Sequence, residues 1–264
     1  MDWNINFHLK GEKTLSSNPK LNWIRLPLEG IENCRELGGY PTKTGEQVSW
    51  RTFLRSSDMS QATEQDIEFL KEYGVRTVID LRGEDEAKAF PNPLANESFC
   101  EYHNIPLFTQ PLTDMNLPKN IDMGDFYIML LENTTTLSAI FETIAEADDG
   151  SIVFHCMAGK DRTGVLAMLL LGIAGVAKKD IITNYEVTYS NMESFHGEGA
   201  ILPEGVPVEF LYSKREYIER AYDYLMENYG SFENYLQSKN ISREVIDKVR
   251  DRLLLKDSDR EWVK

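Results

Sequence analysis

The stretch that decides the fold is Val153-Phe154-His155-Cys156-Met157-Ala158-Gly159-Lys160-Asp161-Arg162-Thr163-Gly164. A short apolar run, Ser151 to Phe154, leads into it, and the longer apolar segment Val165 to Ala174 follows it. This order predicts a strand, a tight loop and a helix buried at the centre of the molecule. The loop carries a cysteine and an arginine with five residues between them.

The chemistry of this loop suits a phosphoryl group. Backbone N–H groups that lead into a helix N-terminus attract an anion, and Gly159 permits a tight backbone path. Arg162 can present its planar guanidinium to two phosphoryl oxygens. Because these surroundings also favour a thiolate, we expect Cys156 to be a nucleophile at neutral pH.

Other residues are candidates for supporting or substrate-binding roles. We expect His155 to order the loop and the Thr163 hydroxyl to donate to the sulfur. Lys160 would add a second cation, and the loop residues between Cys156 and Asp161 (Met157, Ala158, Gly159 and Lys160) would contact the phosphoryl group. Arg55 could line the pocket, whereas Asp80 could position the loop or substrate or form a structural ion pair with Arg82.

The segments before the loop predict an α/β layer. Thr63 and Asp66 form a near-capping box for a helix that ends at Gly74, and a β-branched run of the buried parallel-sheet type follows. Further strands are expected at 50–54 and 100–107, and one helical stretch at about 124–147.

The chain beyond Ala177 is predicted to be mainly helical. Expected helices cover 180–189, 213–229, 231–237 and 242–255, with Ser213 and Glu216 forming a capping box for the second. The Gly/Pro-rich stretch 197–207 predicts a mobile loop, and the region near 190–212 is a candidate lid. We therefore expect an extension at 1–20 and a single domain at 21–264, with an α/β core at 21–176 and a helical part at 177–264.

The composition of the chain argues against several classes of function. The 264 residues include 28 basic and 43 acidic side chains, a formal charge of −15, which disfavours nucleic-acid binding and polybasic membrane binding. An anionic substrate then needs a local positive site. The first twenty residues contain no apolar run of signal-peptide length, and no later segment reaches the length of a membrane span, so the cytoplasm is the default location, with secretion possible if a leader has been removed. Three cysteines favour reduced thiols over a disulfide framework.

The motif His155-Cys-x5-Arg-Thr163 resembles the signature of cysteine-dependent tyrosine and dual-specificity phosphatases. The fuller string to Gly164 is similar to the bacterial and fungal tyrosine phosphatase family, which includes lipid phosphatases. Similar stretches at 33–40, 53–57, 78–82 and 229–235 extend the resemblance to about residues 24–255. It implies a central, mostly parallel sheet flanked by helices, no metal or other cofactor, and hydrolysis through a phosphocysteine.

The resemblance also carries over Asn33 and Arg35. Two neighbouring positions depart from the family. Members usually have an aromatic residue where this chain has Cys34, and an aspartate where it has Glu36. Cys34 or Cys100 could serve as a resolving thiol for an oxidised Cys156.

A general acid must protonate the leaving group and then activate water. Asp161 lies in the loop, and members of the subfamily with Lys-Asp before the arginine are thought to use that aspartate. Related enzymes place the acid on an earlier loop, where this chain has Asp122 and Asp125, with Asp114 nearby. We favour Asp161 because it needs no loop closure.

The sequence leaves the substrate open. Protein phosphotyrosine is our first expectation and a phosphoinositide our second, because the acidic surface disfavours membrane docking. Two other classes of protein could carry such a loop: a module that binds phosphorylated ligands without turnover, and a sulfurtransferase. Cys100 and His103 are only half of a zinc site, so we expect no metal.

Overall fold

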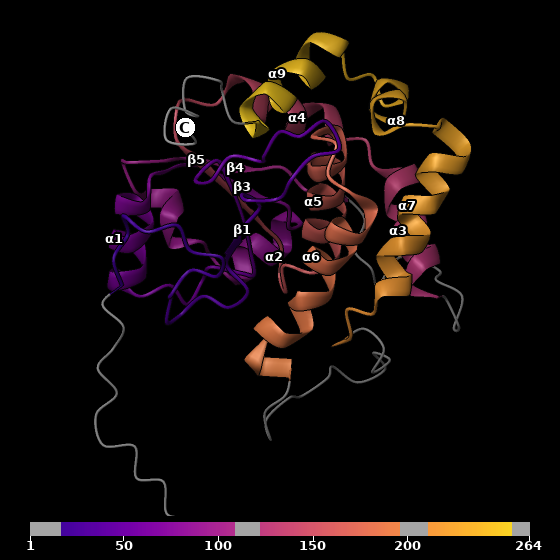
Figure 1. The fold of residues 1–264 in the computed structure, drawn as a ribbon. Coiled ribbons are helices and arrows are strands. Elements are labelled where there is room, and N and C mark those ends of the chain that lie inside the picture. Colours follow the sequence, from indigo (N-terminus) through magenta and orange to yellow (C-terminus); the bar gives the residue numbers. More distant parts are fainter. Residues whose placement is uncertain (1–16, 109–121, 196–210, 255–264) are drawn as a thin grey trace, which may run out of the picture.

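The fold is built on a five-stranded, mostly parallel sheet (Figure 1). This computed structural model describes residues 17–108, 122–195 and 211–254. The strands are β1 (Arg35–Glu36), β2 (Phe53–Ser56), β3 (Val75–Asp80), β4 (Glu101–Asn104) and β5 (Ser151–His155). Their order is β1-β2-β5-β3-β4, and only the β1–β2 pair is antiparallel. The expected α/β class with a mostly parallel central sheet is confirmed.

Helices follow most of the strands, and every regular element described after β5 is a helix. The α-helices are α1 (Glu64–Tyr73), α2 (Glu84–Ala89), α3 (Met123–Asn133), α4 (Leu137–Glu146), α5 (Asp161–Ile173), α6 (Lys178–Asn191), α7 (Arg215–Tyr229), α8 (Phe232–Ser238) and α9 (Arg243–Leu253). Short 3-10 helices occur at Pro93–Asn96 and Glu193–Phe195. The predicted helical C-terminal portion is therefore present.

Alternating side chains send each strand into two different cores. Neighbouring residues of a strand point to opposite faces, so one set packs with α1 and the other with the larger helical group around α5. The first set includes Leu54, Val78 and Val153. The second includes Phe53, Ile79 and Phe154. Figure 1 shows α1 on one side and the orange and yellow helices on the other.

Helix α5 is buried on all sides, as its composition predicts. Every residue from Thr163 to Leu171 is buried, and α5 packs against α6, α8 and α9 as well as against the sheet. A helix so enclosed cannot tilt without opening the core. The loop that enters α5 therefore has a rigid base.

The single helical stretch expected at 124–147 is two helices in the structure. Tertiary contacts explain this correction. Asp122 caps the start of α3 by accepting from the Gly124 amide at 2.7 Å. Between α3 and α4, the Thr134 hydroxyl donates to the carbonyl of Leu107 at 2.9 Å, and Thr136 donates to Pro106 at 2.6 Å. These contacts turn the chain where helical periodicity alone would continue.

Two predicted helix starts have opposite outcomes. The Thr63–Asp66 capping box is present, and Gly74 ends α1 in the left-handed region. The Ser213–Glu216 box is wrong, since α7 begins at Arg215 with Lys214 as its cap. Ser213 instead accepts from the Tyr189 amide and donates to the Glu186 carbonyl, which joins α6 to the segment before α7.

The described helices include none that is both long and apolar enough to cross a membrane. The proposed mobile loop at 197–207 and most of the candidate lid near 190–212 lie outside the described residues, as does Asp114.

Candidate active site

Parallel pairing brings the ends of three strands together. His155 at the end of β5 is in register with Ser56 of β2 and with Asp80 of β3. The residues that follow these strands therefore meet at the carboxyl edge of the sheet, where α/β proteins usually bind ligands. The loop from His155 leads directly into α5, so the predicted strand, loop and helix are confirmed.

Three consecutive carbonyls of this loop are held by neighbouring segments. Each accepts a hydrogen bond from a group outside the loop. The pairs are Met157 O with the Asp58 amide at 2.7 Å, Ala158 O with Asn33 Nδ2 at 2.9 Å, and Gly159 O with Arg55 Nη2 at 2.7 Å. The loop carbonyls thus face the protein.

The loop amides must face the other way. In a trans peptide the N–H points opposite to the preceding C=O, and no cis peptide occurs among the described residues. Within the described chain, the amides of Ala158 and Gly159, which follow the anchored carbonyls of Met157 and Ala158, have no protein acceptor, and the first amides of α5 have no partner within the helix. Together these donors form a nest for an anion beside Cys156.

Gly159 is required by this path. Its φ is 64°, and a Cβ at this position would lie 2.4 Å from the carbonyl oxygen of Ser56. Any other L-residue would therefore be strained and would also push the loop away from β2.

Cys156 is only 2% exposed, and it has a buried cation nearby. Arg55 and Arg35 are both buried beneath the loop, and neither has a carboxylate partner in the described part of the chain. Burial lowers the pKa of Arg55 to about 10, and the nearby Cys156 opposes that shift. Arg55 therefore stays charged at neutral pH.

Arg55 and Arg35 support the loop from behind. Arg55 donates to Gly159 and to Asn184 Oδ1 of α6 at 2.7 Å. Arg35 donates to the Asn184 carbonyl at 2.8 Å and to the Thr188 hydroxyl at 2.9 Å, and it also contacts Asn33. From the sequence, Arg55 is a candidate for lining the pocket. In the structure its side chain is fully buried behind the loop.

Arg162 lies on the first turn of α5 and is fixed by a partner that the sequence analysis missed. Its two terminal nitrogens bind the Glu86 carboxylate, Nη1 to Oε2 at 2.5 Å and Nη2 to Oε1 at 2.9 Å. Burial opposes the charges, but the paired hydrogen bonds raise the pKa of Arg162 and lower that of Glu86. Glu86 also accepts from the Gly83 amide at 2.9 Å, a hydrogen bond that caps the start of α2.

Asp161 opens α5 and is partly exposed. Its Oδ1 accepts from the Tyr127 hydroxyl at 2.6 Å and lies 3.3 Å from Lys160 Nζ. Lys160 is buried, and its ammonium also donates to the Tyr212 carbonyl at 3.2 Å. The loop is thereby joined to the segment before α7.

The alternative acids are engaged elsewhere. Asp125 forms an ion pair with Arg220 of α7 at 2.6 Å, and Asp122 caps α3 and lies 3.9 Å from the same guanidinium. Neither contacts a residue of the loop among the hydrogen bonds and ion pairs of the described chain.

His155 is fully buried and orders the loop. Asn92 accepts from the Leu94 amide through Oδ1, so its Nδ2 faces His155 Nε2 at 3.0 Å, and His155 Nδ1 can donate to the Cys156 carbonyl at 3.1 Å. Burial lowers the pKa of His155, although Asp80 opposes this. The histidine is therefore neutral at neutral pH.

Asp80 is buried and forms an ion pair with Arg82, at 2.6 Å between Oδ2 and Nη2. Arg82 in turn binds Asp58 at 2.5 Å and the Phe90 carbonyl at 2.9 Å. Asp80 thus holds neighbouring segments together and does not reach the surface. Thr163 is also buried, and its hydroxyl has no partner within the described residues.

The two remaining cysteines, Cys34 and Cys100, lie outside the loop. Burial raises the pKa of Cys34 to about 12 and that of Cys100 to about 11. All three cysteines are free thiols. Among the described residues, no three or more His, Cys, Asp or Glu side chains are grouped to hold a metal ion.

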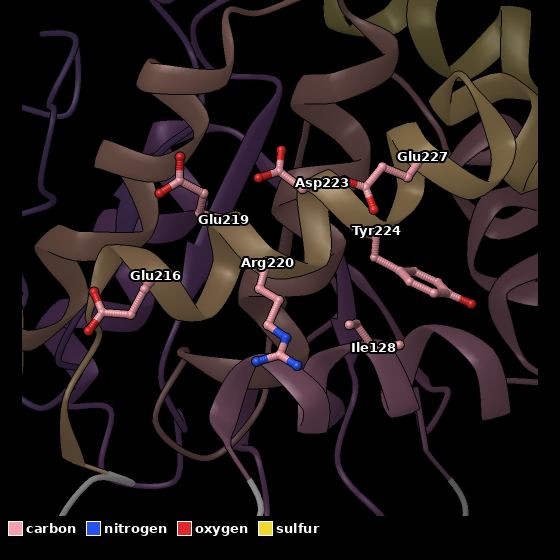
Figure 2. A pocket seen from close by; sticks show the side chains of 7 residues that line it. All are labelled: Ile128, Glu216, Glu219, Arg220, Asp223, Tyr224 and Glu227. Atoms are coloured by element: carbon pink, nitrogen blue, oxygen red, sulfur yellow. The ribbon is translucent and has the colours of Figure 1, made fainter.

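A hollow of about 450 Å³ lies elsewhere, between α3 and α7 (Figure 2). Four carboxylates of α7 (Glu216, Glu219, Asp223 and Glu227) line it, together with Ile128, Arg220 and Tyr224. No loop residue lines it, and its carboxylates would repel a phosphorylated ligand.

Tyrosine phosphatases are among the proteins to which this chain is similar in sequence. A tyrosine-protein phosphatase from Nostoc commune is 31% identical over 76% of this chain and 74% of its own. The triple specificity protein phosphatase PtpB of Mycobacterium tuberculosis is 28% identical over 39% of this chain and 44% of its own. A crystal structure of P. aeruginosa TpbA matches 65% of this chain and 87% of its own, with 17% identity and a TM-score of 0.30. The model of the tyrosine phosphatase family matches residues 26–255, and the chain belongs to this family.

Proposed function

We propose that this protein hydrolyses phosphate monoesters, with protein phosphotyrosine as its main substrate class, through a phosphocysteine on Cys156. The observation that carries the proposal is the anchoring of three loop carbonyls by Asp58, Asn33 and Arg55, which turns the loop amides toward the space beside the thiol. A tetrahedral dianion fits such a set of donors.

The nucleophile is Cys156. Its thiolate would be favoured by the loop amides, by the N-terminus of α5 and by the charge of Arg55. Arg162 would bind two phosphoryl oxygens and stabilise the charge of the transition state. The S–P bond forms as the bond from phosphorus to the leaving oxygen breaks, and water later breaks the S–P bond.

Asp161 would be the general acid of the first step and the general base of the second. It belongs to the loop, is 27% exposed and needs no movement of another segment to reach the leaving oxygen. Asp122 and Asp125 are less suited because both face Arg220.

We propose phosphotyrosine as a better substrate class than phosphoinositides because of the position of Lys160. Its buried ammonium is already held by Tyr212 and Asp161, so it is poorly placed to bind a second phosphate of a headgroup. The mycobacterial relative is named a triple specificity protein phosphatase, which supports testing more than one class of phosphorylated substrate.

The test is hydrolysis of an aryl phosphate without added metal, in wild type and in Cys156→Ser. We expect Cys156→Ser to lose all turnover, while Cys34→Ser and Cys100→Ser, the matched thiol controls, keep it. Iodoacetamide near neutral pH should modify Cys156 first, and phosphate or vanadate should protect it. Turnover that survives in Cys156→Ser would refute the mechanism.

A panel of phosphopeptides and phosphoinositides then decides the substrate class. Faster hydrolysis of phosphotyrosine peptides supports the proposal, and faster hydrolysis of a phosphoinositide overturns that part of it. Phosphate binding without turnover would identify a binding module instead.

A further inference from the structure

Asp161 is the end of a line of hydroxyl groups that runs into the protein core. The Tyr127 hydroxyl lies 2.6 Å from Asp161 Oδ1, and the Tyr185 hydroxyl lies 2.5 Å from that of Tyr127. The three residues come from α3, α5 and α6, and both tyrosines are buried. Three helices thus converge on one carboxylate.

The direction of these hydrogen bonds follows from their chemistry. An ionised carboxylate can only accept, so Tyr127 donates its single proton to Asp161. The Tyr127 oxygen must then accept from Tyr185. Burial, followed by the charge of Asp161, raises the pKa of both tyrosines, so both hydroxyls remain protonated donors.

The two oxygens of Asp161 have different surroundings. Oδ1 receives Tyr127 and lies near Lys160, whereas Oδ2 has no hydrogen-bond partner within the described residues. Since the side chain is partly exposed, Oδ2 is the oxygen free to carry a proton to a substrate.

We propose that Tyr127, supported by Tyr185, is a positioning residue that holds Asp161 for proton transfer through Oδ2. This inference rests on the proposed function and assigns roles to two tyrosines within it. In the first step the leaving oxygen takes the proton from Oδ2 as its bond to phosphorus breaks. In the second, water gives a proton to Oδ2 as its oxygen bonds to phosphorus and the thiolate leaves.

The tyrosine hydroxyl favours proton donation because it binds a carboxylate more strongly than a carboxylic acid. The bond from Tyr127 therefore strengthens as negative charge develops on Asp161 in the transition state. An interaction that is stronger in the transition state than in the ground state raises kcat.

The test compares Tyr127→Phe with Tyr185→Phe. We expect Tyr127→Phe to lower kcat about tenfold for phenyl phosphate, corresponding to about 1.4 kcal/mol, and much less for p-nitrophenyl phosphate, whose leaving group needs little protonation. The alkaline limb of its kcat profile should move to higher pH. Tyr185→Phe should lower kcat for phenyl phosphate and move the alkaline limb in the same directions, but by smaller amounts.

Tyr235→Phe is the matched control, because it removes a buried hydroxyl that donates to the Leu131 carbonyl at 2.8 Å, away from the loop. It should leave the profile and the leaving-group dependence unchanged. If Tyr127→Phe does not fold, the smaller shift in Tyr185→Phe decides the question. An unchanged profile in folded Tyr127→Phe, or in Tyr185→Phe when it alone folds, would overturn the inference.

Asp161→Asn separates this failure from failure of the proposed function. If Asp161→Asn keeps the alkaline limb, Asp161 is not the acid, and its role and that of the tyrosines both fall, whereas hydrolysis through Cys156 is refuted only by turnover in Cys156→Ser. If Asp161→Asn removes that limb while Tyr127→Phe preserves it, only the role of the tyrosines is refuted. In the double variant, Tyr127→Phe should add little to the loss caused by Asp161→Asn.

Discussion

Arg55 is a charged residue buried beneath the loop, with a main-chain carbonyl and an amide oxygen as its hydrogen-bond partners. A buried charge without a carboxylate is costly to the fold unless other interactions offset it. Here, Gly159 and Asn184 accept from it, and a thiolate or phosphoryl group beside the loop would supply the missing negative charge. The residue thus links the stability of the fold to the occupant of the site.

Arg55→Met should lower kcat/KM about tenfold to a hundredfold, because one charge-assisted hydrogen bond to the loop and one nearby positive charge are lost. We also expect alkylation of Cys156 at neutral pH, followed by mass spectrometry, to be slower. Arg252→Met is the control, since Arg252 donates to the carbonyls of Ala147 and Gly150 before β5 and not to the loop. Equal effects of the two substitutions would contradict this role for Arg55.

Sequence patterns at the residue scale identify the loop but not its partners. Cys156 and Arg162 lie within seven positions, so their spacing was visible. Glu86 lies 76 positions from Arg162, and Tyr127 lies 34 from Asp161. The only local sign of Glu86 is its place three residues after Gly83 at a helix start, which does not indicate a partner.

At the scale of elements, the turn from β5 into α5 depends on close contact with β2. Gly159 meets Ser56 there, with a positive φ that other L-residues adopt only with strain. The loop can be this tight only while that position lacks a side chain.

Gly159→Ala should abolish most turnover and lower the free energy of unfolding by more than the roughly 1–2 kcal/mol expected for left-handed backbone strain alone. Gly45→Ala is the matched control, because Gly45 has a φ of 87° but nothing within 4 Å of its absent Cβ. Urea unfolding and kcat measure both effects. A Gly159→Ala protein as active as Gly45→Ala would show that the contact with Ser56 is unimportant.

Local signals explain which elements could be predicted. The Thr63 capping box and the apolar α5 are specified by neighbouring residues, and both are present. The break between α3 and α4 is specified by contacts of Thr134 and Thr136 with a distant segment, which periodicity does not contain. Helix α2 has only six residues and was missed because it is too short for a periodic pattern.

At the scale of the whole molecule, stability should depend on pH through Glu36. Burial raises the pKa of Glu36 to about 7 from 4.5, although Tyr73 and the Arg51 amide donate to it. Between these two values the folded protein holds a proton that the unfolded chain releases. The free energy of unfolding must therefore fall as pH rises through this window.

Glu36→Gln should remove this dependence. Relative to the variant, wild type should lose at most about 1.4 kcal/mol per pH unit between about pH 5 and pH 7. Urea unfolding of both proteins across this range gives the difference between their free energies of unfolding. Buried His155 contributes with the opposite sign, but its contribution is the same in both proteins and cancels in this difference. Parallel curves for the two proteins would show that Glu36 does not titrate as described.

The pairing of Arg162 with Glu86 has a thermodynamic consequence for ligand capture. A free arginine side chain has about 2 kcal/mol of rotamer entropy, which is lost when a ligand immobilises it. Both terminal nitrogens of Arg162 are already fixed by a carboxylate from α2. The rotamer entropy of Arg162 is therefore lost when the protein folds and not when phosphate binds. The incoming group binds to a guanidinium that is already oriented.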